Sequence, residues 1–464
     1  GARTRTFGLR RVHEGGLKRA GDFEMNVGST KTKAEQAFTE SFEAIASRLP
    51  GSEAVRELRR KAIGTFAALG LPHRRIEEWK YTDLRNLLKE AFAPAVGKAA
   101  APSEADLNAA LGPLGTLDTY RVVIVDGAFN AGLSTAQLPD GLTVKALSET
   151  LAEAPDIVRM KREQDAIEAL NSAFATDGAV VRIADRTQLD KPLLLVFARA
   201  GADRKTITTR NVVNIGKDAK VTLVEAYVPL AGAADEDQHN AATEVVVGEG
   251  AAVTHVKAII ENGKAVHLGS ATTEIGANAT YRTFQLTAGP RLARNQIFVT
   301  FVGEGGKLDC SGSFLATNNE HIDTTLVVDH AVPHCQSREL YKGVLDGHGR
   351  GIFQGKVIVR PGAQKTDGKQ MAQALMLSPD AEFDSKPELE IYADDVICGH
   401  GSTAADIDPE HIFYCRARGI PEAEARRLLI EAFIGEVMEK VEDEPVREAL
   451  METARVWLNQ RTAH

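Results

Sequence analysis

The sequence is poor in cysteine, has no excess of positive charge and contains no long hydrophobic run. Only four of its 464 residues are cysteine and no two of them form a C-x-x-C pair, which excludes a disulfide scaffold. Acidic residues number 64 against 55 Lys and Arg, and the formal charge of −9 argues against a nucleic-acid binder. The longest apolar run, 193–198, suits a buried strand and is much shorter than the ~20 residues of a membrane helix. The composition predicts a globular protein of a reducing compartment, without a membrane helix.

Residues 1–24 are rich in Arg and Lys, poor in acids and without apolar periodicity. We interpret them as a disordered leader or an artificial extension ahead of Met25, and exclude them from the fold. An Arg-rich, acid-poor leader is also typical of organellar transit peptides, so that alternative stays open.

Apolar residues recur at helical spacing in the next part of the chain. Two helices are predicted, the first ending at Pro50 and the second at Gly70. A charged segment follows, in which we expect Trp79 and Tyr81 to be packing anchors. Residues 93–113, rich in Ala and Pro, are expected to be a linker or a loosely packed connection.

A short turn unit recurs in the middle of the chain: a turn residue, two positions, a small residue, one position, an apolar residue and a polar one. The small residues of its six copies are separated by 32, 28, 27, 57 and 18 positions, and they are Ala219, Ala251, Ala279, Gly306, Ala363 and Ala381. A small residue at each corner where one strand turns into the next is expected of a parallel β-solenoid. The alternative, a β-sandwich with Gly-rich turns, would show turn signals at an even spacing of about 8–12 residues.

Helices return after residue 400. Asp408 and Pro409 suit an N-cap and a first helical position, and Gly419 suits a left-handed C-terminal cap. Pro421 and Pro445 open two further helices, whose apolar stripe exceeds what an end cap of a solenoid requires. Part of that stripe is therefore expected to be available to a partner.

These patterns predict a mainly β protein, with a parallel β-helix core flanked by N-terminal and C-terminal α-helical domains. The predicted parts of the chain are the leader (1–24), an N-terminal helical domain (25–115), the β-helix core (116–403) and a C-terminal helical domain (404–464).

The usual catalytic and nucleotide motifs are missing. The sequence has no phosphate loop, no G-x-S-x-G elbow and no H-E-x-x-H zinc motif. His330, His334 and Cys335 form an H-x3-H-C cluster that could hold a metal at a strand end. A second ligand set is missing, so packed or surface histidines explain this cluster better.

The segment 386–402 has the alternation of a strand. Its Cys398 and His400 lie two positions apart and therefore share one face. A thiol beside an imidazole suits a soft metal or iron–sulfur ligand pair, or a nucleophile with its base. A purely structural strand end is the alternative.

Four segments carry a resemblance to a known family. They occur in the family's order from about residue 33 to the end of the chain, and they are 77–84 (EEWKYTDL), 363–367 (AQKTD), 386–402 and 412–420 (IFYCRARGI). Together they resemble the SufB/SufD family of iron–sulfur cluster assembly scaffolds of the SUF system. The SufD type fits better, because the SufB type lacks the EEWKYTDL element and carries extra cysteines.

The resemblance implies a right-handed parallel β-helix between two helical domains, and a non-catalytic subunit. Such a subunit pairs with SufB, and each of the two binds one copy of the ATPase SufC, mainly through the C-terminal helical region. The family's functional histidine matches His400, with Cys398 before it; the residue between them is commonly Ser and is Gly399 here. Without SufB, family members form homodimers through the same solenoid edge.

The resemblance also implies the cofactors and the candidate surfaces. A transient Fe–S cluster is expected at the interface with SufB, where His400 could share a metal with the partner, and ATP is expected on SufC. A reduced flavin is associated with the family's assembled complex, but this sequence shows no flavin motif. The residues expected to dock the ATPase are Phe413, Tyr414, Arg416, Arg418, Leu428 and Phe433.

A second class of function stays open at this point. A solenoid enzyme, either carbohydrate-active or a metal-dependent hydrolase using His330 and His334, would need a concave face with clustered acids and aromatics. For the scaffold we expect the cytoplasm of a bacterium, or an organellar stroma if residues 1–24 are a transit remnant, with no nucleic acid or membrane as partner.

Overall fold

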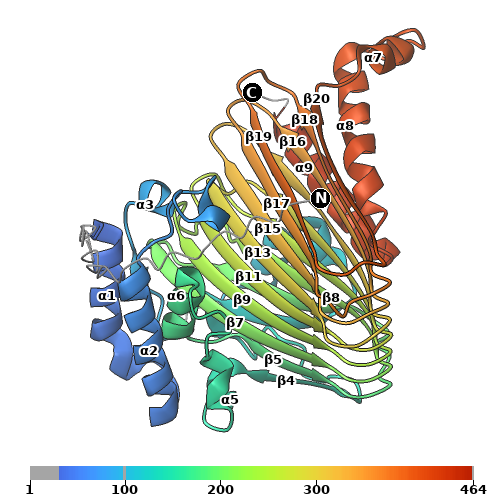
Figure 1. Cartoon of the computed structure of the whole chain (residues 1–464). Helices are drawn as coiled ribbons and strands as arrows, with labels where there is room; N and C mark the ends of the chain where they lie inside the picture. The colour runs from blue at the N-terminus through green and yellow to red at the C-terminus, as the bar shows by residue number, and fades with distance from the viewer. Residues whose placement is uncertain (1–30, 98–100, 462–464) are drawn as a thin grey trace, which may run out of the picture. The chain divides into compact units, whose positions relative to one another are not determined.

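The computed structural model describes residues 31–97 and 101–461, and the chain from Thr32 onward forms one compact unit. The expected leader, 1–24, lies outside the described residues. The described part is a parallel β-solenoid with helices packed on the outer faces of its two sheets (Figure 1). The predicted fold class is therefore confirmed.

Two ten-stranded sheets make up the solenoid, and each coil contributes one strand to each of them. Sheet A contains β1 (Ala93–Pro94), β4 (Leu142–Ala146), β5 (Ala179–Ile183), β7 (Lys205–Ile215), β9 (Gln238–Val247), β11 (Val266–Ile275), β13 (Leu292–Phe301), β15 (His321–His330), β17 (Arg350–Val359) and β19 (Glu382–Ile391). Sheet B contains β2 (Tyr120–Val125), β3 (Ala128–Phe129), β6 (Leu193–Arg199), β8 (Lys220–Pro229), β10 (Ala252–Ile260), β12 (Thr280–Ala288), β14 (Lys307–Ala316), β16 (Gln336–Leu345), β18 (Asp367–Met376) and β20 (Ile397–Ala405). Neighbouring strands are parallel except in the pairs β2–β3 and β4–β5.

The space between the two sheets is the main core. Alternate residues of every strand point into it, so the strands of both sheets bury Val, Ile, Leu and aromatic side chains there. Phe197 and Tyr227 stack at 4.4 Å between ring centroids, and Tyr341 and Phe353 stack at 4.6 Å. The apolar run 193–198, which suits a buried strand, forms the fully buried β6.

The repeated turn unit lies at the corners between strands, as predicted. The backbone N–H groups of Ala219, Ala251 and Ala279 each donate to the carbonyl of the turn residue three positions earlier. All three alanines are buried. At the equivalent corner Gly306 has no room for a side chain, because a Cβ there would lie 2.8 Å from Phe301 Cδ1. Small residues at these positions therefore let one strand turn tightly into the next.

Helices of the N-terminal half cover the outer face of sheet A (Figure 1). Phe38 and Phe66 lie edge to face at 5.7 Å, as do Phe42 and Phe174, and the latter comes from a fully buried helix that contacts β7 and β9. The helices on this side of the solenoid are α1 (Lys33–Ile45), α2 (Glu53–Leu69), α3 (Leu84–Leu87), α5 (Leu147–Thr150) and α6 (Ala166–Phe174), with 3-10 turns η1 (Ala46–Arg48), η2 (Glu77–Trp79) and η4 (Pro155–Val158).

The expected packing anchors behave differently. Trp79 is buried under the guanidinium of Arg294, which lies 4.4 Å from its ring centroid, whereas Tyr81 is only half-buried.

The outer face of sheet B is covered by α4 (Glu104–Leu111), η3 (Gly112–Thr116), α8 (Glu422–Met438) and α9 (Glu444–Arg461). One expectation was wrong here. The expected linker at 93–113 contains β1 and α4, and α4 buries Leu107 and Leu111 against the sheet. The C-terminal helices do not cap an end of the solenoid, since α8 lies along β14 and β16.

Helix α7 (Pro409–Arg416) starts as predicted, with the Asp408 carboxylate accepting from the Glu410 N–H at 2.8 Å. Gly419 has the expected positive φ of 84°. All described residues from Thr32 onward belong to one compact unit. The division of this unit into three folded domains stays a prediction.

Candidate functional site

The last strand, β20, carries both Cys398 and His400. Within the described residues it pairs on one side only, with β18, so its other edge is unpaired. Cys398 is opposite Gly368 and His400 is opposite Gln370 in the parallel register. Because residues two apart share a face, both side chains belong to the inner face of sheet B. The two candidate residues are therefore brought together where the solenoid interior opens.

The two side chains have different environments. Cys398 is half-buried and packs against the core between the sheets, and burial raises the pKa of its thiol. His400 is exposed. An exposed imidazole beside a partly covered thiol offers two soft ligands from one edge, fewer than the four that close a tetrahedral metal site.

A buried row of polar residues leads from this edge into the solenoid. Across sheet B, Cys310, Glu339, Gln370 and His400 are successive register partners and point to the same side. Glu339 is buried, and neither of its carboxylate oxygens has a hydrogen-bond partner. Burial raises the pKa of this carboxyl to about 8. Sequence analysis did not find this row. The only signal was strand alternation: Leu340 faces outward, so Glu339 beside it must face inward.

A cleft of about 480 Å³ lies at the same edge, and Cys398 and His400 are among the residues that line it. Its other lining residues include Gly399 and Gly401 of β20, Lys369 and Met371 of β18, and Lys440. Since Gly399 has no heavy atom within 4 Å of where its Cβ would lie, the family's usual Ser would fit there. The edge is therefore accessible from both faces.

The six residues expected to dock an ATPase are not equally available. Phe413 is 73% exposed, Tyr414 58% and Leu428 39%. In contrast, Phe433 is half-buried against the solenoid, with Lys342 Nζ 4.3 Å from its ring centroid.

The two arginines of this set are exposed and have intramolecular partners. The Arg418 guanidinium lies 3.4 Å from the ring centroid of Tyr414, and Arg416 pairs with Glu422 at 3.3 Å. Whether these six residues dock an ATPase stays a prediction.

The H-x3-H-C cluster does not come together as a metal site. His330 is buried at the end of β15, and its Nε2 lies 3.0 Å from Ser337 Oγ. His334 is exposed with a φ of 62°, and Cys335 is buried at a corner of the solenoid. Among the described residues these three are not a group whose ligand atoms converge. The sequence pattern arises instead from a strand end followed by a left-handed turn.

Comparison with known proteins decides the family. A family model described as "SUF system FeS cluster assembly, SufBD core domain" matches residues 197–433, and one described as "SufBD protein N-terminal region" matches residues 30–195. The chain belongs to the SufBD family. The resemblance predicted from four sequence segments is thus confirmed.

Individual relatives agree with this assignment. The chain is 31% identical over 387 residues to the iron–sulfur cluster assembly protein SufD of Escherichia coli, covering 82% of this chain and 88% of that protein. It is 32% identical over 399 residues to an iron–sulfur cluster assembly SufBD family protein of Synechocystis, covering 82% and 86%. A chloroplastic protein of Arabidopsis thaliana named ABCI7 is 26% identical over 426 residues, covering 88% and 87%. The chain is therefore an iron–sulfur cluster assembly protein of the SufBD family and a homologue of SufD.

No helix in the described part of this SufBD family member is both long and apolar enough to cross a membrane.

Proposed function

We propose that this chain is a SufD-type scaffold subunit that pairs with a SufB-like subunit and binds a SufC-like ATPase, without turnover of its own. It would support cluster assembly and iron acquisition. The transient Fe–S cluster would form at the interface with the SufB-like subunit, and ATP would bind to the SufC-like partner. A reduced flavin would belong to the complex, and no stable cofactor is assigned to this chain alone.

One observation carries the proposal: the unpaired strand β20 bears an exposed imidazole and a half-buried thiol on the face that opens to the end of the solenoid. Unpaired strands offer backbone N–H and C=O groups to a second sheet. Strand β19 of the other sheet also ends the solenoid, pairing only with β17 among the described residues. A second solenoid that added its own edge there would supply the ligands that one chain lacks.

The ATPase surface is proposed at the exposed apolar residues around α7, namely Phe413, Tyr414 and Leu428. Large apolar side chains that stay exposed on α7 and α8 favour a protein partner. For an isolated chain we propose a homodimer through β19 and β20. The proposed compartment is a bacterial cytoplasm, or an organellar stroma if residues 1–24 are a transit remnant.

The test is co-expression of the tagged chain with a SufB-like and a SufC-like subunit, followed by purification and measurement of subunits, iron and sulfide. We expect all three subunits to copurify with bound cluster. In a His400→Ala complex the subunits should copurify normally, but with several-fold less iron and sulfide. His348→Ala removes another exposed imidazole, from a turn, and should change neither quantity. An intact His400→Ala complex with normal cluster content would contradict the proposed role of this residue.

A further inference from the structure

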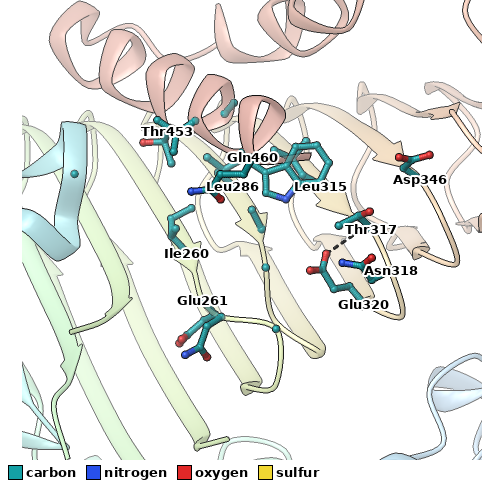
Figure 2. A pocket seen from close by; sticks show the side chains of 18 of the residues that line it. Ile260, Glu261, Leu286, Leu315, Thr317, Asn318, Glu320, Asp346, Thr453 and Gln460 are labelled. Atoms are coloured by element: carbon teal, nitrogen blue, oxygen red, sulfur yellow. Dashed lines mark hydrogen bonds between the residues drawn. The ribbon is translucent and has the colours of Figure 1, made fainter. Parts of the chain in front are cut away.

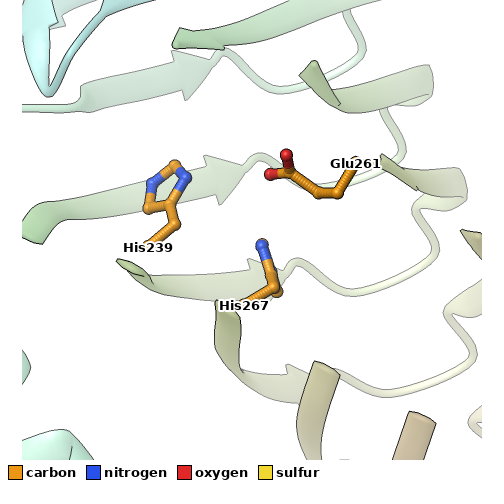
Figure 3. A group of neighbouring side chains, drawn as sticks. All are labelled: His239, Glu261 and His267. Carbon is orange, nitrogen blue, oxygen red and sulfur yellow. The ribbon is translucent and has the colours of Figure 1, made fainter. Parts of the chain in front are cut away.

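Two histidines and a glutamate meet inside the solenoid, far from the edge described above. His239 of β9 and His267 of β11 are direct register partners in sheet A, and Glu261 follows the last residue of β10 in sheet B. One ligand atom from each of the three lies within 4.8 Å of the others (Figure 3). The group therefore joins the two sheets across the interior.

The imidazoles of this group lack ordinary partners. All three side chains are buried. His267 has no hydrogen-bond partner at either ring nitrogen, and His239 has none at Nδ1, while its Nε2 lies 3.0 Å from Thr209 Oγ1. Burial lowers the pKa of both imidazoles, so each is neutral and keeps a lone pair. A buried polar atom without a partner costs free energy, and a bound ion would remove that cost.

The charges around the group are mixed: Arg199 and Lys257 add to the effect of burial in lowering the pKa of both imidazoles, and buried carboxylates offset these two cations. Arg199 donates to Glu261 Oε2 from Nε at 3.0 Å and to Asp237 Oδ2 from Nη1 at 2.9 Å, and Lys257 interacts with Glu225. These five buried groups comprise three carboxylates and two cations, so the set has one negative charge in excess when all are ionised. Both hydrogen bonds from Arg199 to the glutamate go to Oε2, which leaves Oε1 for a ligand.

Glu261 also borders a cleft in the protein surface. This cleft of about 890 Å³ lies between α9, the segment from α4 to η3 and the turns at one side of sheet B. Glu261 lines this cleft next to Ile260 (Figure 2). Gly289 and Trp457 line it as well. Residue 261 thus borders the cleft, while its carboxylate points inward to Arg199 and the buried group.

We propose that His239, His267 and Glu261 bind one divalent transition-metal ion, such as Fe²⁺ or Zn²⁺, with water in a fourth position. Two imidazoles and one carboxylate suit these ions, whereas Mg²⁺ and Ca²⁺ prefer oxygen ligands throughout. The inference does not rest on the proposed function, because it concerns the isolated chain.

The test uses the full chain in a Cys398→Ser, His400→Ala background, which removes the candidate ligands at the edge. Metal-free protein is loaded with Zn²⁺, desalted and analysed for bound metal, and Co²⁺ is used to record the visible spectrum. We expect about one equivalent of Zn²⁺ and the intense visible bands of a four-coordinate Co²⁺ site. Glu261→Gln, His239→Gln and His267→Gln should each lose most of the bound metal and these bands.

His330→Gln is the matched control, because it replaces another buried imidazole of sheet A that lies outside the group. It should keep both the stoichiometry and the spectrum. Circular dichroism checks that each variant folds, and the rise in melting temperature of the parent protein with added Zn²⁺ is a second measurement that needs no variant. Absence of that rise, absence of bound metal in the parent, or unchanged binding in all three folded variants would each overturn the proposal.

Discussion

Glu339 and His400 lie in the same inner row of sheet B, two strands apart, with Gln370 between them. The first is a buried carboxyl without a hydrogen-bond partner, and the second is an exposed imidazole. The interior of the solenoid thus carries an ionisable group close to its open end.

This carboxyl should make stability depend on pH. Burial raises its pKa from the ordinary 4.5 to about 8, so the folded chain holds a proton that the unfolded chain has released. The resulting stabilisation is complete below pH 4.5, falls as pH rises and is lost above about 8. Urea unfolding between pH 5 and 9 should therefore show a smaller loss of stability in Glu339→Gln than in the parent. Identical pH profiles for the two proteins would rule out this assignment.

The proposed self-association can be tested at the unpaired edge. Ile397 of β20 is 66% exposed, and Lys at this position would place charge on the pairing surface. Light scattering should show a dimer for the parent chain and a monomer for Ile397→Lys at equal concentration. Val302→Lys, at an apolar residue that is 53% exposed in the turn between β13 and β14, is the control and should stay dimeric. A dimer that survives the Ile397 substitution would place the interface elsewhere.

The proposed ATPase surface predicts that some substitutions weaken SufC-like binding without changing the stability of the fold. Replacing Phe413 and Tyr414 by Ala should weaken SufC-like binding at least tenfold in calorimetry without a change in melting temperature, because both are exposed. Phe433→Ala should destabilise the fold by about 2 kcal/mol, because its ring packs against the solenoid. Removing all of 404–464 is a less clear test, since it would also uncover the apolar outer face of sheet B. Unchanged affinity in the double variant would contradict the proposed surface.

The corner packing predicts a sharp difference between two glycines. Gly306→Ala would place a Cβ 2.8 Å from Phe301 Cδ1 and should lower the free energy of unfolding by about 1–3 kcal/mol. Gly362→Ala, in the turn between β17 and β18, meets no heavy atom within 4 Å and should be nearly neutral. Chemical denaturation of the two variants measures this difference, and equal stabilities would show that the corner tolerates a side chain.

Much of the fold could be predicted because the corner residues repeat in the sequence. Ala219, Ala251 and Ala279 carry that signal clearly, since each follows a turn residue at a fixed distance. Helix α4 was missed because it has only eight residues, of which only Leu107 and Leu111 are large and apolar, and these two pack on sheet B. Local composition could not reveal that tertiary contact.

The candidate site was only partly visible for a similar reason. Cys398 and His400 are close in sequence, so strand alternation alone puts them on one face. His239 and His267 are neighbours only through the coil register, and their separation equals that of Ala251 and Ala279. A search of the sequence for histidines at that separation would have paired these two. It would not have found Glu261, which comes from the other sheet and does not lie at that separation from either histidine.

Helix α8 is tied to the middle of the solenoid, and this has a mechanical consequence. Glu436 pairs with Lys342 of β16 at 2.5 Å, and just beyond the helix Lys440 pairs with Asp309 of β14 at 3.5 Å. In the described part of the chain no salt bridge involves β20. A partner that pulls on α7 therefore applies its force to β20, from which only residues 406–408 separate α7, and through α8 to the middle of the solenoid. Two such subunits would separate as rigid bodies at their paired edges, and no strand would have to unpair within either sheet.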